Sequence, residues 1–182
     1  MAVAWYFRLF YIWLVSFGVS FLLFYIIQAK RMTSAGPGKL WAIIFWLVMI
    51  IGVVLMWFTT FRIAASFWIG AAILIFGQIM YALGYAAMRE YPERKKKVVD
   101  WGIYGVSRHS HVLAGSVTLV GIVIMGWNPG SIVYFVLWAY VVAHIIIGHL
   151  AILAEEKINL RKFGKDYEEY MRTVPRYFWI LN

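Results

Sequence analysis

The stretch that decides the fold is LWAIIFWLVMIIGVVLMWFT, residues 40–59, which contains no charged side chain. About twenty mainly apolar residues are what an α-helix needs to cross the hydrocarbon core of a bilayer. Four further stretches are similarly apolar, approximately Trp5–Gln28, Ile63–Met88, Val112–Trp127 and Ile132–Ala154. The sequence therefore predicts an all-α polytopic membrane protein with about five transmembrane helices. The first stretch is too long and aromatic for a cleaved signal peptide, so we expect a retained helix.

The composition of the whole chain supports this prediction. Of its 182 residues, 64% are hydrophobic and 14% are charged, whereas about 25% of the residues in a typical soluble domain are charged. A soluble domain of about this size buries only some two-thirds of its surface, which excludes an ordinary globule for so apolar a chain. The chain has no cysteine, and this excludes disulfides, thiolate metal ligands and cysteine nucleophiles.

Positive charge is concentrated on one side of the predicted layout. The net charge is +9, and with five spans 15 of the 17 Lys and Arg residues lie on one side, all except Arg8 and Arg62. The positive-inside rule then predicts an integral membrane protein with its N-terminus outside and its C-terminus in the cytoplasm. We interpret the basic excess as a signal of topology and of contact with anionic lipid, and we expect no nucleic-acid partner.

We expect a single membrane domain over residues 1–182, with an N-terminal three-helix part (1–94) and a second part (95–182). The turn Asn128-Pro129-Gly130 joins the last two spans into a helical hairpin. Beyond the last span, apolar residues recur at helical spacing, namely Phe163, Tyr167, Tyr170, Met171 and Val174. This spacing predicts a C-terminal amphipathic helix that lies on the membrane surface or packs back on the bundle.

Polar residues cluster in two places on the predicted cytoplasmic side. One is the segment Lys95–His111, which ends in Arg108-His109-Ser110-His111, and the other begins at Glu155-Glu156. Because both clusters are on one side, they could line one pocket. An alternative is that Arg108 is an interfacial arginine with its head in water, and that the two glutamates form surface ion pairs. We expect the stretch Gly102–Gly105 to be a loop.

Histidines in the last span offer fewer clues. His144 and His149 are five residues apart, so they project about 140° away from each other on a helix. One of them could face the bundle interior, where packing or an interhelical hydrogen bond is the simplest role. The chain has neither an HExxH helix nor repeated HxxxH boxes, so we expect no metal site. It also lacks the glycine-rich motifs of Rossmann and P-loop nucleotide sites.

A longer pattern connects the two polar clusters. Gly102-Ile103-Tyr104 precedes Arg108-His109, an Asn-Pro turn follows, and then come Glu155-Glu156, six residues, Phe163-Gly164 and Val174-Pro175-Arg176. This pattern, over about residues 96–177, resembles the isoprenylcysteine carboxyl methyltransferase and phospholipid methyltransferase superfamily. The resemblance implies an integral membrane enzyme that uses S-adenosylmethionine and acts on a lipid or lipophilic acceptor from the bilayer. A phospholipid headgroup amine is our first choice of acceptor.

The resemblance also implies which residues contact the cofactor. By position these are Lys97, Val98, Val99, Tyr104, Arg108, His109, Ser110, His111, Val112, Glu155 and Glu156. If the acceptor is an ammonium group, it must lose a proton, and His111 and His149 are the candidates for that catalytic role.

The chain departs from the family pattern at several positions. The family's proline after Arg-His is Ser110 here, its tyrosine is Val112 and its glycine is Ala114. The carboxyl-methylating branch has an arginine where this chain has Ala151, which counts against a prenylated cysteine as the acceptor. Prenylcysteine-like activity, a non-catalytic membrane scaffold and a membrane reductase with a nicotinamide cofactor are the alternatives. The oligomeric state stays open.

Overall fold

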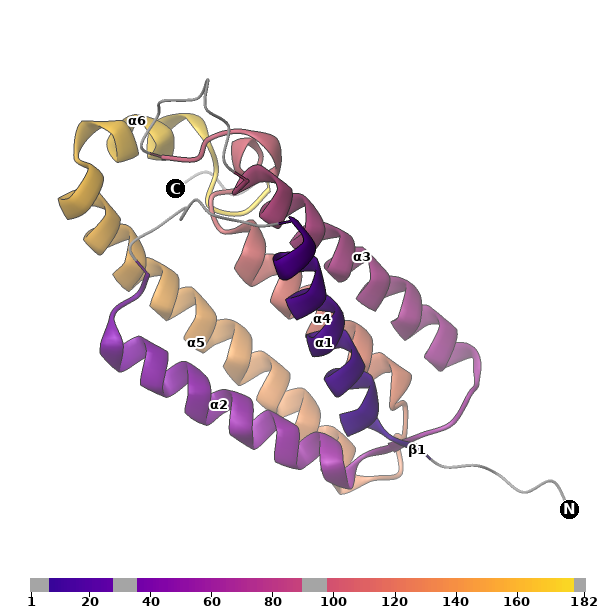
Figure 1. Cartoon of the computed structure of the whole chain (residues 1–182). Helices are drawn as coiled ribbons and strands as arrows, with labels where there is room; N and C mark the ends of the chain where they lie inside the picture. The colour runs from indigo at the N-terminus through magenta and orange to yellow at the C-terminus, as the bar shows by residue number, and fades with distance from the viewer. Residues whose placement is uncertain (1–6, 28–35, 90–97, 179–182) are drawn as a thin grey trace, which may run out of the picture.

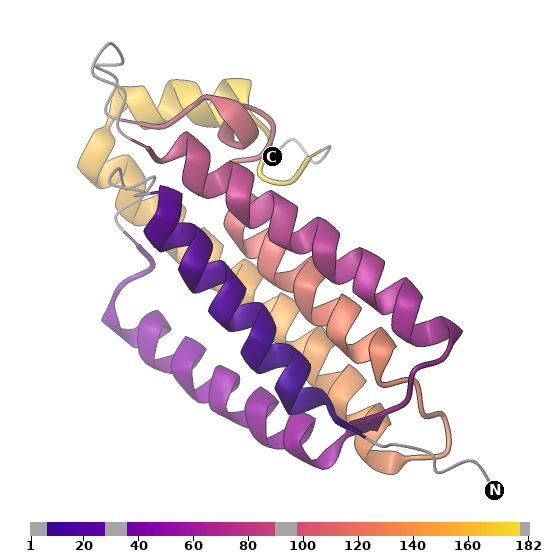
Figure 2. The same ribbon diagram turned by 45° about the vertical axis from the view of Figure 1, so that its right-hand side comes forward.

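The structure, a computed structural model, describes residues 7–27, 36–89 and 98–178. Five helices run side by side in an elongated bundle (Figure 1): α1 (Leu9–Ile27), α2 (Lys39–Phe58), α3 (Ala65–Ala87), α4 (Ser110–Met125) and α5 (Ile132–Phe163). A short helix, α6 (Lys165–Thr173), lies across one end of the bundle, as both views show (Figure 2). We call this the α6 end. The connections from α2 to α3 and from α4 to α5 lie at the opposite end.

Four of the helices, α1, α2, α3 and α5, are long and apolar enough to cross a membrane. This confirms the prediction of an all-α polytopic membrane protein. The fifth apolar helix, α4, has 16 residues and is about 24 Å long, shorter than the hydrocarbon core of about 30 Å. Half of its residues are buried, so neighbouring helices cover much of the surface that a lipid-facing helix would expose.

Glycines on α3 allow α4 to approach closely. Gly70, Gly77 and Gly84 are seven residues apart, and a Cβ atom at any of them would collide with α4. At Gly77 that atom would lie 2.9 Å from the backbone nitrogen of Thr118 and 3.0 Å from the carbonyl oxygen of Ala114. Small residues at such spacing let transmembrane helices pack backbone against backbone. The spacing of these glycines is visible in the sequence.

Two expectations from the sequence are wrong, and a third element is longer than its predicted span. Residues Phe7–Arg8, expected within the first helix, form strand β1, which pairs antiparallel with β2 (Thr60–Phe61). The segment Gly102–Gly105, expected to be a loop, is a 3₁₀-helix, η1. The predicted last span, to about Ala154, lies within α5, which continues as a helix to Phe163. Its last turns are rich in Glu, Lys, Leu and Arg, which favour the helix even where hydropathy falls.

The C-terminal helix packs back on the bundle. Gly164, with a φ of 57°, separates α5 from α6, a backbone conformation that glycine adopts readily. Tyr167, Tyr170 and Val174 form a buried cluster with Val98, and Phe163 and Met171 pack against it. The predicted apolar face is thus confirmed, and it is turned toward the chain rather than toward the membrane surface. The Tyr170 hydroxyl also donates to the carbonyl oxygen of Tyr104 in η1 (2.8 Å).

Candidate functional site

One buried carboxylate, Glu156 on α5, gathers three side chains at the α6 end. Arg108 Nη2 donates to Glu156 Oε1 (3.0 Å) and Arg176 Nη2 donates to Oε2 (2.7 Å). His109 Nε2 lies 3.2 Å from Oε1. The side chain of Arg108 is 0% exposed and that of Glu156 is 5% exposed. The alternative in which Arg108 is a solvent-facing interfacial residue is therefore wrong, and so is a surface ion pair for Glu156.

The electrostatics of this cluster favour an ionised carboxylate. Glu156 lies beyond Ala154, in the charged last turns of α5 outside the predicted span. Burial by itself would raise its pKa, but hydrogen bonds from His109, Arg176 and Arg108 outweigh burial and hold the pKa of Glu156 well below its usual range. The hydrogen bond between Arg176 and Glu156 also raises the pKa of Arg176. A buried charge of this kind is tolerated only when it is paired and hydrogen-bonded.

This cluster ties the C-terminal segment to the start of α4. Arg108 Nη1 donates to the carbonyl oxygens of Met171 (2.8 Å) and Val174. The Arg108 backbone nitrogen donates to the carbonyl oxygen of Pro175 (3.0 Å), and Ser107 Oγ donates to that of Arg176 (3.0 Å). The polar atoms of the cluster therefore form hydrogen bonds chiefly with one another and with the backbone. We call Arg108, His109, Glu156 and Arg176 the arginine clamp.

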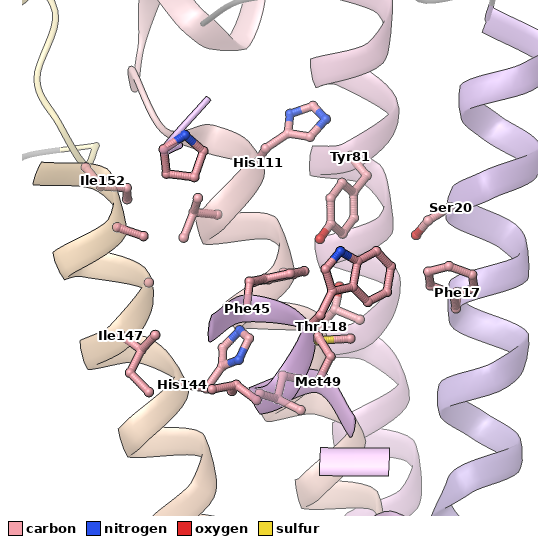
Figure 3. A pocket seen from close by; sticks show the side chains of 18 of the residues that line it. Phe17, Ser20, Phe45, Met49, Tyr81, His111, Thr118, His144, Ile147 and Ile152 are labelled. Atoms are coloured by element: carbon pink, nitrogen blue, oxygen red, sulfur yellow. The ribbon is translucent and has the colours of Figure 1, made fainter. Parts of the chain in front are cut away.

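A cavity of about 550 Å³ lies inside the bundle, with walls from all five long helices (Figure 3). Its lining is mostly apolar, and the polar side chains on it are Ser16, Ser20, Gln78, Tyr81, His111, Thr118, Tyr140, His144 and Glu155. Phe17 of α1 and Phe45 of α2 line the cavity and are each 49% exposed. The cavity therefore reaches the outer surface of the bundle, where lipid would lie.

His111 lies at the part of the cavity nearest to the α6 end (Figure 3). Its Nδ1 is 2.6 Å from the hydroxyl of Tyr104, and the two rings are nearly parallel. The rings of Tyr81 and Tyr85 approach it edge-on, with centroids 5.4 Å and 4.9 Å away. Its Nε2 is buried and has no hydrogen-bond partner among the described residues. Three tyrosine side chains thus surround the imidazole.

The residues that the resemblance places at the cofactor fall into two groups. His111, Val112 and Glu155 line the cavity, whereas Arg108, His109 and Glu156 belong to the arginine clamp. Tyr104 connects the first group to α6, because its hydroxyl meets His111 and its carbonyl oxygen accepts a hydrogen bond from Tyr170 of α6.

The remaining predicted residues lie apart from the cavity lining. Val98 and Val99 are buried in two apolar clusters, with Tyr170 and with Tyr104 respectively. Ser110 is fully buried, and in the part of the chain that the structure describes its Oγ has no hydrogen-bond partner. His149 Nδ1 is 2.8 Å from the hydroxyl of Tyr177. Lys97 lies outside the described residues.

Several cavity residues were missed by the sequence analysis. Gln78 of α3 links to α1 twice, since Ser20 Oγ donates to its Oε1 (2.8 Å) and its Nε2 donates to Ser16 Oγ (2.9 Å). A glutamine in an otherwise apolar span was the available signal. Thr118 and Tyr81 gave no comparable signal, because hydroxyl residues are common in transmembrane helices. Within the described ranges, no three His, Asp or Glu residues are grouped so as to hold a metal ion.

Comparisons with known proteins identify the family to which the chain belongs. No curated protein and no solved structure matches the chain significantly. A family of proteins of unknown function, designated DUF1295, matches residues 1–174. Because this match covers nearly all of the 182 residues, the chain belongs to the DUF1295 family of proteins of unknown function.

Proposed function

We propose that this chain is a membrane methyltransferase that uses S-adenosylmethionine and acts on a lipid or lipophilic acceptor in the cavity. The observation that carries the proposal is the placement of Glu155 and His111 on one cavity that is open toward lipid. Both belong to the motifs that resemble the methyltransferase superfamily. Small-molecule sites are typically mostly apolar cavities of 300–1,000 Å³ with a few polar groups, as here.

The residues on the cavity suit this cofactor. S-adenosylmethionine is a cation with an ammonium group and ribose hydroxyls, and it supplies an electrophilic methyl group when bound. Glu155 is the only Asp, Glu, Lys or Arg on the lining within the described part of the chain, and its carboxylate can accept hydrogen bonds from such donors. His111 lies on the same cavity and is assigned to the acceptor. The arginine clamp would position these groups without contacting the cofactor.

The lining favours an amine over a carboxylate as the acceptor. Ala151 lines the cavity, so at this position no guanidinium is present to bind a substrate carboxylate. An ammonium headgroup must lose a proton before it attacks a methyl group. His111 Nε2 can accept that proton in the tautomer whose hydrogen is on Nδ1, donated to the Tyr104 oxygen. A phospholipid headgroup amine therefore remains our first choice.

Calorimetric titration of the purified full chain with S-adenosylmethionine tests the cofactor site. Glu155→Ala should abolish measurable binding, whereas Glu168→Ala, an exposed glutamate on α6, should bind like the unsubstituted protein. Unchanged affinity of the Glu155→Ala protein would show that the site assignment is wrong. Incubation with labelled S-adenosylmethionine and a total lipid extract then identifies the acceptor, and transfer to no lipid species would count against the proposed activity.

A further inference from the structure

The cavity does not extend through the whole bundle. Its lining ends on α5 at Tyr140 and on α2 at Met49. Beyond these residues a buried apolar cluster fills the space between the helices, and it includes Leu9, Met56 and Leu137. Tyr140 belongs both to this cluster and to the cavity lining. The cavity is therefore closed toward the end of the bundle that is opposite α6, and Tyr140 lies at the closed end.

The side chain of Tyr140 reaches across the bundle at this closed end. It starts on α5 and extends to the backbone of α2, because a Cβ atom added at Gly52 would collide with the Tyr140 ring and hydroxyl. His144, one turn nearer the α6 end, places its ring against that of Tyr140, with centroids 5.9 Å apart. The tyrosine ring thus occupies the gap between two helices where the cavity ends.

The lateral opening of the cavity lies between α1 and α2. Among the described lining residues, the exposed ones all belong to these two helices, namely Phe17, Ala42, Phe45 and Trp46. Near the end opposite α6 the two helices are in contact, since the rings of Phe10 and Trp57 have centroids 5.4 Å apart. From there α1 and α2 diverge toward the α6 end (Figures 1 and 2). A hydrocarbon chain can thus enter sideways from the surrounding lipid.

The position of charge determines how a lipid would be oriented in the cavity. Glu155, the single Asp, Glu, Lys or Arg on the described lining, lies about 22 Å from Tyr140 along α5. A charge at membrane depth is costly, so a polar group belongs near Glu155 and a hydrocarbon chain extends toward Tyr140. The chains of one leaflet are about 15 Å deep, half of the hydrocarbon core. The cavity therefore matches a chain of the leaflet on the α6 side.

The polar side chains of α1 and α3 on the lining have partners within the protein. Ser20 Oγ donates to Gln78 Oε1 (2.8 Å), and Gln78 Nε2 donates to Ser16 Oγ (2.9 Å). Nearer the closed end the lining includes the apolar residues Met49 and Ile122. This part of the cavity suits a hydrocarbon chain, which offers no hydrogen bonds.

We propose that the cavity holds one hydrocarbon chain of the acceptor, taken from the leaflet on the α6 side, and that Tyr140 limits the length of this chain. The inference rests on the proposed function for the amine at the polar end. A cavity of about 550 Å³ is the size of a site for one small ligand, so a second chain of the same lipid stays in the bilayer. A chain longer than the distance from Glu155 to Tyr140 must displace closely packed side chains, which is unfavourable.

Photo-crosslinking of the full chain in phosphatidylcholine nanodiscs, without S-adenosylmethionine, measures how deep the chain lies. Two hexadecylamine probes carry a diazirine either beside the amine or at the far end of the chain. The first should label Ala151 and Ile152 near Glu155, and the second should label Met49 and Ile122 near the closed end. Excess hexadecylamine should remove both labels. Labelling that is independent of the diazirine position, or that is confined to outward-facing residues, would overturn the proposal.

Competition with the far-end probe tests the role of Tyr140. Hexadecylamine should compete about tenfold better than eicosylamine, whose extended chain is longer than the cavity, because overpacking is unfavourable. In Tyr140→Leu, which removes the ring, the two amines should compete about equally. Tyr140→Phe keeps the ring and should keep the tenfold difference. An equal response to the two amines in the unsubstituted protein, or an undiminished difference in Tyr140→Leu, would show that Tyr140 does not limit the chain.

A second variant leaves the buried cluster around Tyr140 intact. Ile147 lines the cavity midway between Glu155 and Tyr140 on α5. Ile147→Trp should weaken competition by hexadecylamine about tenfold and leave competition by octylamine, a shorter chain, unchanged. The matched control is Ile146→Trp, since Ile146 is 55% exposed on the outer surface of the same helix, and both amines should compete there as in the unsubstituted protein. Full competition by hexadecylamine in Ile147→Trp would refute a chain at this depth.

The chain site and the proposed methyl transfer can fail separately. Depth-dependent labelling by the amine probes, in a protein that does not bind S-adenosylmethionine, would support the chain site and count against the methyltransferase. Binding of S-adenosylmethionine by a protein whose cavity residues are not labelled by the probes would overturn the chain site alone.

Discussion

Glu155 and Glu156 are adjacent on α5 but have different surroundings: Glu155 lines the cavity, whereas Glu156 is buried against Arg108. Consecutive residues of an α-helix project about 100° apart, so one acidic pair can serve two surfaces. We infer that Glu155 is available to a ligand, whereas Glu156 maintains the structure of the α6 end. This division makes the two glutamates separable by experiment.

Glu156→Gln should destabilise the fold. It leaves the buried guanidinium of Arg108 without its counter-charge, and breaking a buried ion pair in this way costs about 3–5 kcal/mol. Thermal unfolding in detergent should show a clear fall in Tm, and limited proteolysis should release the C-terminal segment that Arg108 binds. Glu155→Gln, on the cavity, should change the unfolding free energy by less than about 1 kcal/mol. Equal Tm values for the two variants would contradict the division of roles.

The stability of the α6 end should depend on pH below the ordinary carboxyl pKa of 4.5. In the folded protein the pKa of Glu156 is lowered, so its ionised form contributes stability that is fully present above about pH 4.5. This contribution is lost as the pH falls through the lower folded pKa. Denaturant titrations at successive pH values should therefore show a decline that is shallower in Glu156→Gln. Because the other carboxyls titrate alike in both proteins, parallel declines would exclude this role for Glu156.

The spans could be predicted from the sequence because the bilayer imposes a length on each apolar run. Residues 40–59 correspond to α2 within one residue at each end. The apolar face of α6 could also be predicted, since the spacing of Tyr167, Tyr170 and Val174 fits one face of a helix. In both cases the information is local, within one element of the chain.

The candidate site could not be predicted in the same way, because it depends on contacts between residues that are far apart in the sequence. Arg108 is buried because Glu156, 48 residues later, and the carbonyl groups of the C-terminal segment satisfy its guanidinium. From the sequence alone, an arginine at the start of a span is equally compatible with an interfacial position. The cavity depends on how five helices are placed relative to one another, and hydropathy does not contain that arrangement. The resemblance gave a set of residues near the site, but it did not separate those on the cavity from those in the arginine clamp.

Gly77→Ala should weaken the packing of α3 on α4. The added methyl group would meet the Thr118 side chain and backbone and the Ala114 carbonyl oxygen, so the helices must move apart at a cost of about 1–3 kcal/mol. Gly18→Ala on α1 is the matched control, because nothing lies within 4 Å of its added Cβ and alanine favours a helix over glycine by about 1 kcal/mol. Unfolding in increasing SDS should order the proteins with Gly77→Ala as the least stable. A Gly77→Ala protein as stable as Gly18→Ala would mean that the backbones are not in close contact.

The orientation in the membrane can be tested with single cysteines, because the chain has none of its own. Asn128→Cys places a thiol at the exposed turn between α4 and α5, and Glu168→Cys places one on the exposed face of α6 at the opposite end of the bundle. Since most of the basic residues that the structure describes belong to the α6 end, the positive-inside rule predicts that this end is cytoplasmic. A membrane-impermeant maleimide applied to intact cells should therefore label Asn128→Cys, and it should label Glu168→Cys only after the cells are lysed. The reverse pattern would contradict the orientation, whereas labelling of both thiols from outside would show that α5, the helix between them, does not bring the chain across the membrane.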